Sequence, residues 1–303
     1  MTDVVFVVDP EGRAPATGLL QAVHERGART WAARTPALEI VDGRARCRVD
    51  PLRNGVAPTR LWLDEAAAIV VCLRPPLTEL HRTATLVLDL VDPARTALIN
   101  APAGLRAGDG LALRFPGLGP PTLVSADPAA LRAFVAEHRV VVAAPVGGCV
   151  GSRVLRLDRH DPNLPHLADI VTAAGTRAAV LQPYLRETTA GTTRVHVVDG
   201  EPVAAVRHPP ADAGPAVTCR VTDRDREICA GTAPALVAHG IHFAGLDLIG
   251  RYLVGIDATG ASLGRPGAPL APEVCAEIAG KLLDGTFLSP VPAGACPAPA
   301  GTR

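Results

Sequence analysis

Lysine is almost absent from this chain of 303 residues. Of its 30 basic residues, 29 are arginine and only Lys281 is lysine. Arginine can replace lysine in surface ion pairs, but not in every chemical role of the amine. Any lysine-dependent chemistry must therefore use Lys281.

A net charge is also absent, because 30 acidic residues balance the basic ones and the sequence pI is near 7.1. This balance excludes a basic face for nucleic acid and a polybasic membrane anchor. The first residues, Met1-Thr2-Asp3-Val4, lack the features of a signal peptide, and no apolar run approaches membrane-spanning length. We therefore expect a cytoplasmic protein with a small-molecule substrate and with neither nucleic acid nor membrane as a partner.

The sequence also lacks cysteine pairs with a recognisable spacing. The seven cysteines are dispersed, without a CxxC or other metal-binding spacing, which favours reduced thiols over a disulfide framework. Most are expected to be small core residues. Cys149 lies in a glycine-rich segment and is the one thiol to examine for reactivity.

Hydrophobic residues make up 48% of the chain, which is enough for a sizeable core. The first third alternates apolar runs with helical patterns and predicts an open βα sheet over residues 1–120. Its strands are expected at 4–8, 67–73 and 97–100, its helices at about 14–26 and 79–90, and a hairpin at 37–49. The Gly/Pro-rich stretch 107–121 is predicted to be a domain connection.

Two α+β units are predicted to follow, at residues 121–185 and 186–289, with a disordered tail at 290–303. The first contains a strand–glycine loop–strand unit over 140–157. The second contains hairpins that turn at Asp199-Gly200 and at Gly250-Arg251. Further strands are expected at 121–124 and 178–185, and helices at about 125–137, 163–174, 223–239 and 271–283.

Four segments in this order carry a family resemblance: Leu98-Ile99-Asn100-Ala101-Pro102, Gln182-Pro183-Tyr184-Leu185, the stretch from Arg194 to Val203, and Gly245-Leu246-Asp247-Leu248-Ile249-Gly250. From about residue 4 to 285 the chain resembles the bacterial glutathione synthetase family of ATP-grasp carboxylate–amine ligases. The resemblance implies an ATP-grasp fold of mixed α/β and α+β class, with an N-terminal βα sheet domain before two α+β subdomains. It also implies a homodimer or homotetramer.

In that family ATP phosphorylates a substrate carboxylate, and an amine then attacks the acyl phosphate. The reaction needs cations on the phosphates, acidic ligands for Mg²⁺ and a donor-rich lid. The family places lysines where this chain has Ala101 and Ala144. Loss of both should weaken nucleotide binding by several kcal/mol, at roughly 1.5–3 kcal/mol per charge-assisted hydrogen bond.

The implied metal ligands are altered as well. Asp247 matches the family aspartate, but the family glutamate is replaced by Gly255 and the family asparagine by Asp257. Two carboxylates on facing strands can still hold one Mg²⁺ that keeps several waters. The alternative is that Asp247 is an ion-pair partner of Arg251 or Arg194.

The lid segment 207–215 is shorter than in the family and lacks its arginine, asparagine and double-glycine pattern. The glycine loop over 147–151 keeps its glycines but contains Val150. A glycine-rich loop alone is weak support for phosphate binding.

Carry-over by position gives the candidate site residues. The catalytic candidates are Arg194, His208, Asp247 and Glu187, and the substrate-binding candidates are Arg74, Arg153, Tyr184, Asp199 and Thr259. Gly147, Gly148, Gly151 and Gln182 are candidates for a bound nucleotide, and Asp247 and Asp257 for Mg²⁺. His196 shares a strand face with Arg194, where it can be structural or catalytic.

Because cations, metal ligands and lid are altered together, the sequence favours a repurposed ATP-grasp enzyme that needs no cofactor. Such an enzyme would carry out a cyclisation, an addition or another acid–base reaction on a carboxylate- or amine-bearing metabolite. The first alternative is a divergent ligase that uses ATP and Mg²⁺, and the second is a non-catalytic binding protein.

Overall fold

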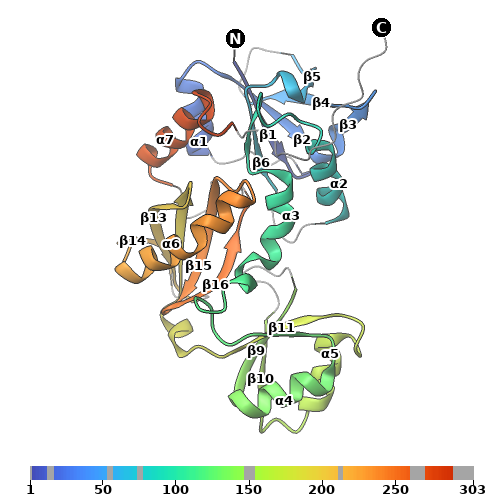
Figure 1. Cartoon of the computed structure of the whole chain (residues 1–303), viewed down its shortest axis with the longest axis vertical. Coiled ribbons are helices and arrows are strands. Elements are labelled where there is room, and N and C mark those ends of the chain that lie inside the picture. Colours follow the sequence, from blue (N-terminus) through green and yellow to red (C-terminus); the bar gives the residue numbers. More distant parts are fainter. Residues whose placement is uncertain are drawn as a thin grey trace.

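The computed structural model describes residues 2–11, 17–52, 57–73, 78–146, 154–210, 214–259 and 270–288. These residues form three sheets, each covered by helices (Figure 1). No helix in these ranges is long and apolar enough to cross a membrane.

The first sheet has the order β3-β4-β2-β1-β6-β7, with β5 paired to β4. Its elements are β1 (Asp3–Val8), β2 (Arg29–Arg34), β3 (Leu38–Val41), β4 (Arg44–Pro51), β5 (Thr59–Trp62), β6 (Ala68–Cys72), β7 (Ala97–Ile99), α1 (Thr17–Glu25), α2 (Glu79–Leu88) and α3 (Pro102–Leu111). Strand β1 is parallel to both β2 and β6. Val4 and Phe6 pack under α1 and α7 (Pro272–Leu283), whereas Val5 and Val7 pack against α2 and α3. Burial on both faces explains the continuous apolar run of β1.

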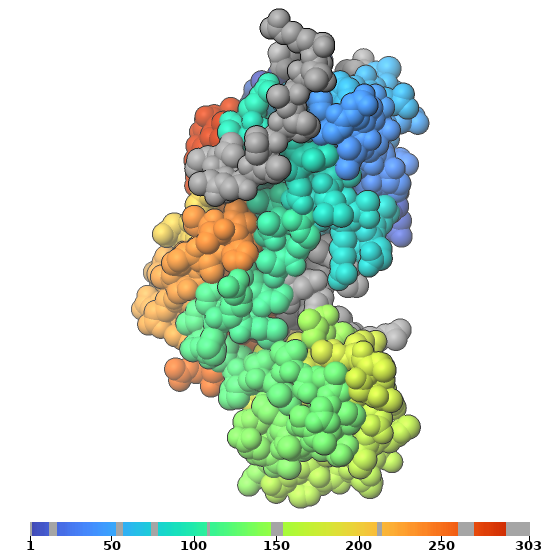
Figure 2. Space-filling model, turned by 45° about the vertical axis from the view of Figure 1, so that its right-hand side comes forward, coloured from blue at the N-terminus to red at the C-terminus, as the bar shows by residue number. Residues whose placement is uncertain are grey.

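The second sheet is antiparallel in the order β10-β9-β11-β8. Its elements are β8 (Leu123–Ser125), β9 (Val140–Pro145), β10 (Leu155–Asp158), β11 (Ala179–Pro183), α4 (Pro128–His138) and α5 (Leu164–Thr172). Val141 and Ala143 of β9 are buried in the same cluster as Leu131 of α4 and Ala168 of α5. Because successive strand residues point to opposite faces, Ala144 lies on the face away from these helices. This unit forms a separate lobe at the lower end of the molecule (Figure 2).

The third sheet has the order β14-β13-β12-β15-β16. Its elements are β12 (Thr192–Val198), β13 (Glu201–His208), β14 (Val217–Cys219), β15 (Phe243–Ile249), β16 (Tyr252–Asp257) and α6 (Asp223–Ala238). Val195 and Leu246 are buried with Ile228 of α6 on one face. On the other face, Val198 and Phe243 join the core of the first sheet. The third sheet is therefore fixed to the N-terminal domain by an apolar contact.

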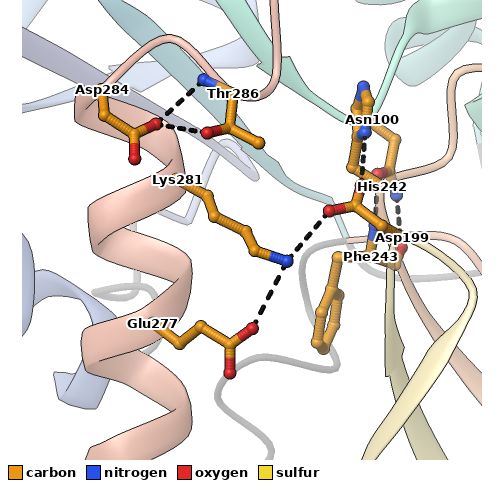
Figure 3. A network of polar contacts seen from close by, with 8 residues as sticks. All are labelled: Asn100, Asp199, His242, Phe243, Glu277, Lys281, Asp284 and Thr286. Carbon is orange, nitrogen blue, oxygen red and sulfur yellow. Dashed lines mark hydrogen bonds and ion pairs between the residues drawn. The ribbon is translucent and has the colours of Figure 1, made fainter.

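Helix α7 brings the chain back to its beginning, where it packs against α1 (Figure 1). Its Lys281 also contacts the third sheet, because Nζ lies 3.1 Å from Oδ2 of Asp199, at the turn between β12 and β13 (Figure 3). Within α7, the same Nζ lies 3.3 Å from Glu277 Oε1. The other oxygen of Asp199 lies 2.9 Å from His242 Nδ1. Burial would raise the pKa of Asp199, but hydrogen bonds from His242 and Lys281 outweigh it and lower that pKa. Burial likewise opposes the charge of Lys281, whose pKa is nevertheless raised by Asp199 and Glu277.

The segment 107–121 is not only a connection, because its first residues complete helix α3. Pro102 begins this helix with a suitable backbone angle, and Leu105 and Leu111 bury its apolar side. Strands β2, β5 and β14 were also not predicted. The glycine loop with Cys149 and the tail at 290–303 lie outside the described residues.

Candidate active site

Three residues of the third sheet lie in one row across neighbouring strands. Arg194 of β12 is paired with Asp247 of β15, which is paired with Gly255 of β16. Directly opposed residues of antiparallel strands have their side chains on the same face. Asp257 lies two residues beyond Gly255 and therefore shares that face.

The side chain of Arg194 joins the two aspartates. Its Nε and Nη2 donate to Asp247 at 2.8 and 2.7 Å, and its Nη1 donates to Asp257 at 3.0 Å. The side chains of Arg194, Asp247 and Asp257 are only 1%, 5% and 10% exposed. Burial opposes the charge on the guanidinium, but the attraction of Asp247 and then of Asp257 outweighs it and raises the pKa of Arg194. The arginine is therefore permanently charged.

Thr259 completes the cluster by donating to Asp257 Oδ1 from its backbone N, at 3.0 Å, and its hydroxyl, at 2.6 Å. Each of the four carboxylate oxygens of Asp247 and Asp257 thus accepts a hydrogen bond from Arg194 or Thr259. In the described ranges, no three His, Cys, Asp or Glu side chains are grouped so that they could hold a metal. The residues present do not fit the Mg²⁺ site that the family implies. The structure pairs Asp247 with Arg194, which is one of the two partners that the sequence left open.

Asn100 connects this cluster to the first sheet. Its side chain is buried at the end of β7, where it accepts from Phe243 N at 2.9 Å and donates to Phe243 O at 2.6 Å. It also donates to the carbonyl of Ala258, the residue between Asp257 and Thr259. Asn100 was named from the sequence only as part of a family segment. The one signal that could have singled it out is a polar residue at the end of an apolar strand.

The open face of the second sheet carries Gln182, the one nucleotide candidate that lies within the described residues. Gln182 of β11 is paired with Val142, which shares the face of Ala144, and its Nε2 donates to the hydroxyl of Thr122 at 3.1 Å. Tyr184 lies beyond β11, and the guanidinium of Arg156 is 5.8 Å from the centre of its ring. Arg156 was not predicted, although it is the one cation that β10 presents on the face of Ala144.

Several candidates are not brought to the Arg194 cluster. Asp199, predicted to bind substrate, is held by His242 and Lys281 at the far end of β12, about 16 Å along the strand at 3.3 Å per residue. Glu187 is exposed and lies against Gly250 at the turn between β15 and β16.

The two histidines differ in their surroundings. His196 is 2% exposed and stacks on Phe243 with ring centres 5.9 Å apart. His208 is the last residue of β13, opposite Thr192, and is partly exposed on the face of Arg194. Of these two histidines, His208 is the more exposed to solvent. The remaining predicted site residues lie outside the described ranges: Arg74, Arg153, Gly147, Gly148 and Gly151.

Comparison with known sequences identifies both parts of the chain. Residues 3–106 match the N-terminal domain of prokaryotic glutathione synthetase, and residues 111–263 match its ATP-grasp domain. The glutathione synthetase of Synechococcus elongatus is 34% identical over 290 residues, which cover 84% of this chain and 90% of that protein. That of Thermosynechococcus vestitus is 32% identical over 293 residues, covering 85% and 92%.

Solved structures show the same fold at lower identity. The ATP-grasp ligase PsnB, complexed with a minimal precursor, Mg and ADP, superposes with a TM-score of 0.65 at 19% identity, covering 93% of this chain and 98% of PsnB. The D-cycloserine synthetase DcsG gives 0.62 at 20% identity, covering 92% and 99%. The chain is an enzyme of the prokaryotic glutathione synthetase family and has the ATP-grasp fold.

Proposed function

We propose that this enzyme joins a small carboxylate to an amine in an ATP-dependent ligase reaction. ATP phosphorylates the carboxylate and leaves as ADP, and the amine then displaces phosphate from the acyl phosphate. The observation that carries this proposal is the match to both family domains, in sequence order, over residues 3–106 and 111–263. The comparisons favour this alternative over the cofactor-free enzyme expected from the sequence.

The described residues provide some of the groups that such a reaction needs. Gln182 and Tyr184 share the open face of the second sheet, where they would contact the nucleotide, and Arg156 would supply a positive charge. His208 would contact substrate on the face of Arg194. Asp247 and Asp257 are engaged by Arg194, so these two carboxylates do not present a site for Mg²⁺.

A second candidate function is supported by the two missing lysines. Ala144 leaves the open face of β9 without a cation, and Ala101 packs against Gly240, with its backbone N bonded to Gly240 O at 3.0 Å. An enzyme that binds nucleotide weakly could transform a carboxylate- or amine-bearing metabolite by acid–base chemistry without ATP. The relatives found by comparison are glutathione synthetases, so glutathione synthesis is the first ligase activity to test, although the lid segment lacks the family pattern.

Calorimetric titration with ATP and ADP, with and without Mg²⁺, tests the first candidate, together with ADP release in the presence of carboxylate and amine pairs. Nucleotide binding with substrate-dependent ADP release supports the ligase. Absence of both would refute it and leave the second candidate, which predicts substrate conversion without ATP.

A gain-of-function variant checks the assignment of the nucleotide face. Ala144→Lys adds a cation to β9 and should tighten ATP binding by roughly 10- to 100-fold, the effect of one charge-assisted hydrogen bond of about 1.5–3 kcal/mol. Val124→Lys is the matched control, because Val124 is exposed on the same face of the sheet but two strands away. Equal effects of the two lysines would contradict the assignment.

A further inference from the structure

The third sheet contains a buried cation that belongs to the protein itself. Arg194 lies between two aspartates from neighbouring strands and is bonded to three of their four carboxylate oxygens, while Thr259 donates to the fourth. In the row that contains Arg194 and Asp247, the residue on β16 is Gly255, which has no side chain to provide another oxygen.

We propose that Arg194 is a resident cation that replaces a divalent metal between β15 and β16, so that this cluster binds no Mg²⁺ in the native enzyme. A metal ion between the carboxylates of Asp247 and Asp257 would need oxygen lone pairs directed at it. Those oxygens are already directed at the guanidinium, with the bidentate geometry that arginine forms with carboxylates.

Electrostatics favour the same conclusion. A divalent ion at these oxygens would lie a few ångströms from a guanidinium that is 1% exposed, so water cannot screen their repulsion. The arginine cannot relieve this repulsion by releasing its proton, because a guanidinium stays charged in proteins. Displacing its side chain would leave a buried charge without its partners, which is strongly unfavourable.

The inference goes beyond the proposed function, because it holds whether or not the enzyme uses ATP. In either case, Arg194 fixes the positions of the Asp247 and Asp257 carboxylates without a metal ion. Metal in an ATP-dependent reaction would have to arrive with the nucleotide and not through this pair of carboxylates.

Binding of Mn²⁺, measured by the loss of its free electron paramagnetic resonance signal, tests the proposal without reference to turnover. The native enzyme should leave millimolar Mn²⁺ free. Arg194→Met removes the positive charge and keeps a long apolar side chain. This variant should bind Mn²⁺ at least about 100-fold more tightly than the native enzyme. A unit charge about 4 Å from the metal changes its dissociation constant by more than about 100-fold at a protein-surface dielectric. Mn²⁺ at about 100 times its dissociation constant should then raise the melting temperature of this variant by roughly 5 °C or more.

Arg29→Met is the matched control. Arg29 also donates from Nε and Nη2 to one aspartate, Asp3, but among the described residues its ion pair is with that single carboxylate. Its melting temperature should not respond to Mn²⁺.

Tight Mn²⁺ binding by the native enzyme that is abolished by Asp247→Asn would overturn the proposal. So would an Arg194→Met variant that folds but responds to Mn²⁺ no more than Arg29→Met does. If Arg194→Met folds only when Mn²⁺ is present, the proposal is supported. If it does not fold at all, the titration of the native enzyme decides alone. A loss of ATP-dependent activity has no part in this readout, so failure of the ligase proposal and failure of the resident cation remain distinguishable.

Discussion

Replacing Asn100 by alanine should strongly destabilise the enzyme, because this one side chain connects the first and third sheets. Asn100 is fully buried and makes three hydrogen bonds to the backbone of the third sheet, two to Phe243 and one to Ala258. The change leaves one buried N–H and two buried carbonyl oxygens without this partner. At about 1 kcal/mol net per hydrogen bond, and more for a donor left unsatisfied, the loss is about 3–5 kcal/mol.

Urea unfolding measures this loss with two signals. Trp31 and Trp62 both lie in the first sheet, so their fluorescence follows that domain, whereas circular dichroism follows the whole chain. Asn100→Ala should lower both midpoints and separate them, because the bonds that it removes connect the first and third sheets. Asn163→Ala is the control, since Asn163 is exposed and makes no capping bond with its side chain, and it should change stability by no more than about 0.5 kcal/mol.

Asn100→Asp separates the hydrogen bonds from the shape of the side chain. An ionised carboxylate would face the carbonyl oxygens of Phe243 and Ala258, so burial and repulsion would raise its pKa in the folded state. Its stability should therefore be greatest below the unfolded value of about 3.9 and should fall as the pH rises through the folded value. Equal stability of Asn100→Ala and Asn163→Ala, or a pH-independent Asn100→Asp, would refute the reasoning.

Two further substitutions test other parts of the structure. Lys281→Met should cost about 1 kcal/mol at neutral pH, because it removes one of the two partners of a part-buried Asp199. Because the pKa of Asp199 is lowered in the folded state, this contribution to stability is lost as the pH falls below about 4. Because the pKa of Lys281 is raised, the contribution is also lost as the pH rises above about 10.5. Unfolding free energies measured over a pH series check this, with Arg82→Met as the control for an exposed ion pair. Gly191→Ala should cost about 3 kcal/mol or more, because Gly191 has φ +93° and an added Cβ would collide with the backbone of His208 and Pro209. Gly43→Ala, with φ +76° and no atom within 4 Å of the added Cβ, should cost only about 1–2 kcal/mol in thermal unfolding, and equal losses would contradict the collision.

Local signals predicted most of the strands and helices. The apolar run from Val4 to Val8 is a strand buried on both faces, and Asp127 caps α4 through the N–H groups of Ala129 and Ala130. The hairpin turn at Asp199-Gly200 has positive φ at both residues, as its sequence predicted. Each of these features depends on a few neighbouring residues.

Helix α3 could not be predicted in the same way, because three of its residues are glycine. Gly104 is explained only by its tertiary contacts, since an added Cβ would lie 2.5 Å from His239 O and 2.6 Å from a side-chain carbon of Ile241. Helix propensity disfavours glycine, and the packing of α3 against the end of α6 overrides it.

The candidate site shows the same limit. The sequence left Arg251 and Arg194 as possible partners of Asp247, and only the strand register selects Arg194. Arg251 instead lies over the ring of Tyr252 at 6.0 Å. Asp199 was assigned to substrate by its position in the family segment from Arg194 to Val203. The return of α7, which brings Lys281 to it, leaves no signal in the local sequence.

That return of α7 also constrains how the enzyme is made. Cys275, Ile278, Leu282 and Phe287 fill the same core as Val4 and Leu19, although the ribosome joins them to the chain more than 250 residues later. The part of this face that α7 covers must therefore stay open to solvent until α7 has been synthesised. Domains commonly fold in order during synthesis, but here the core of the first sheet can be completed only after α7 has been added.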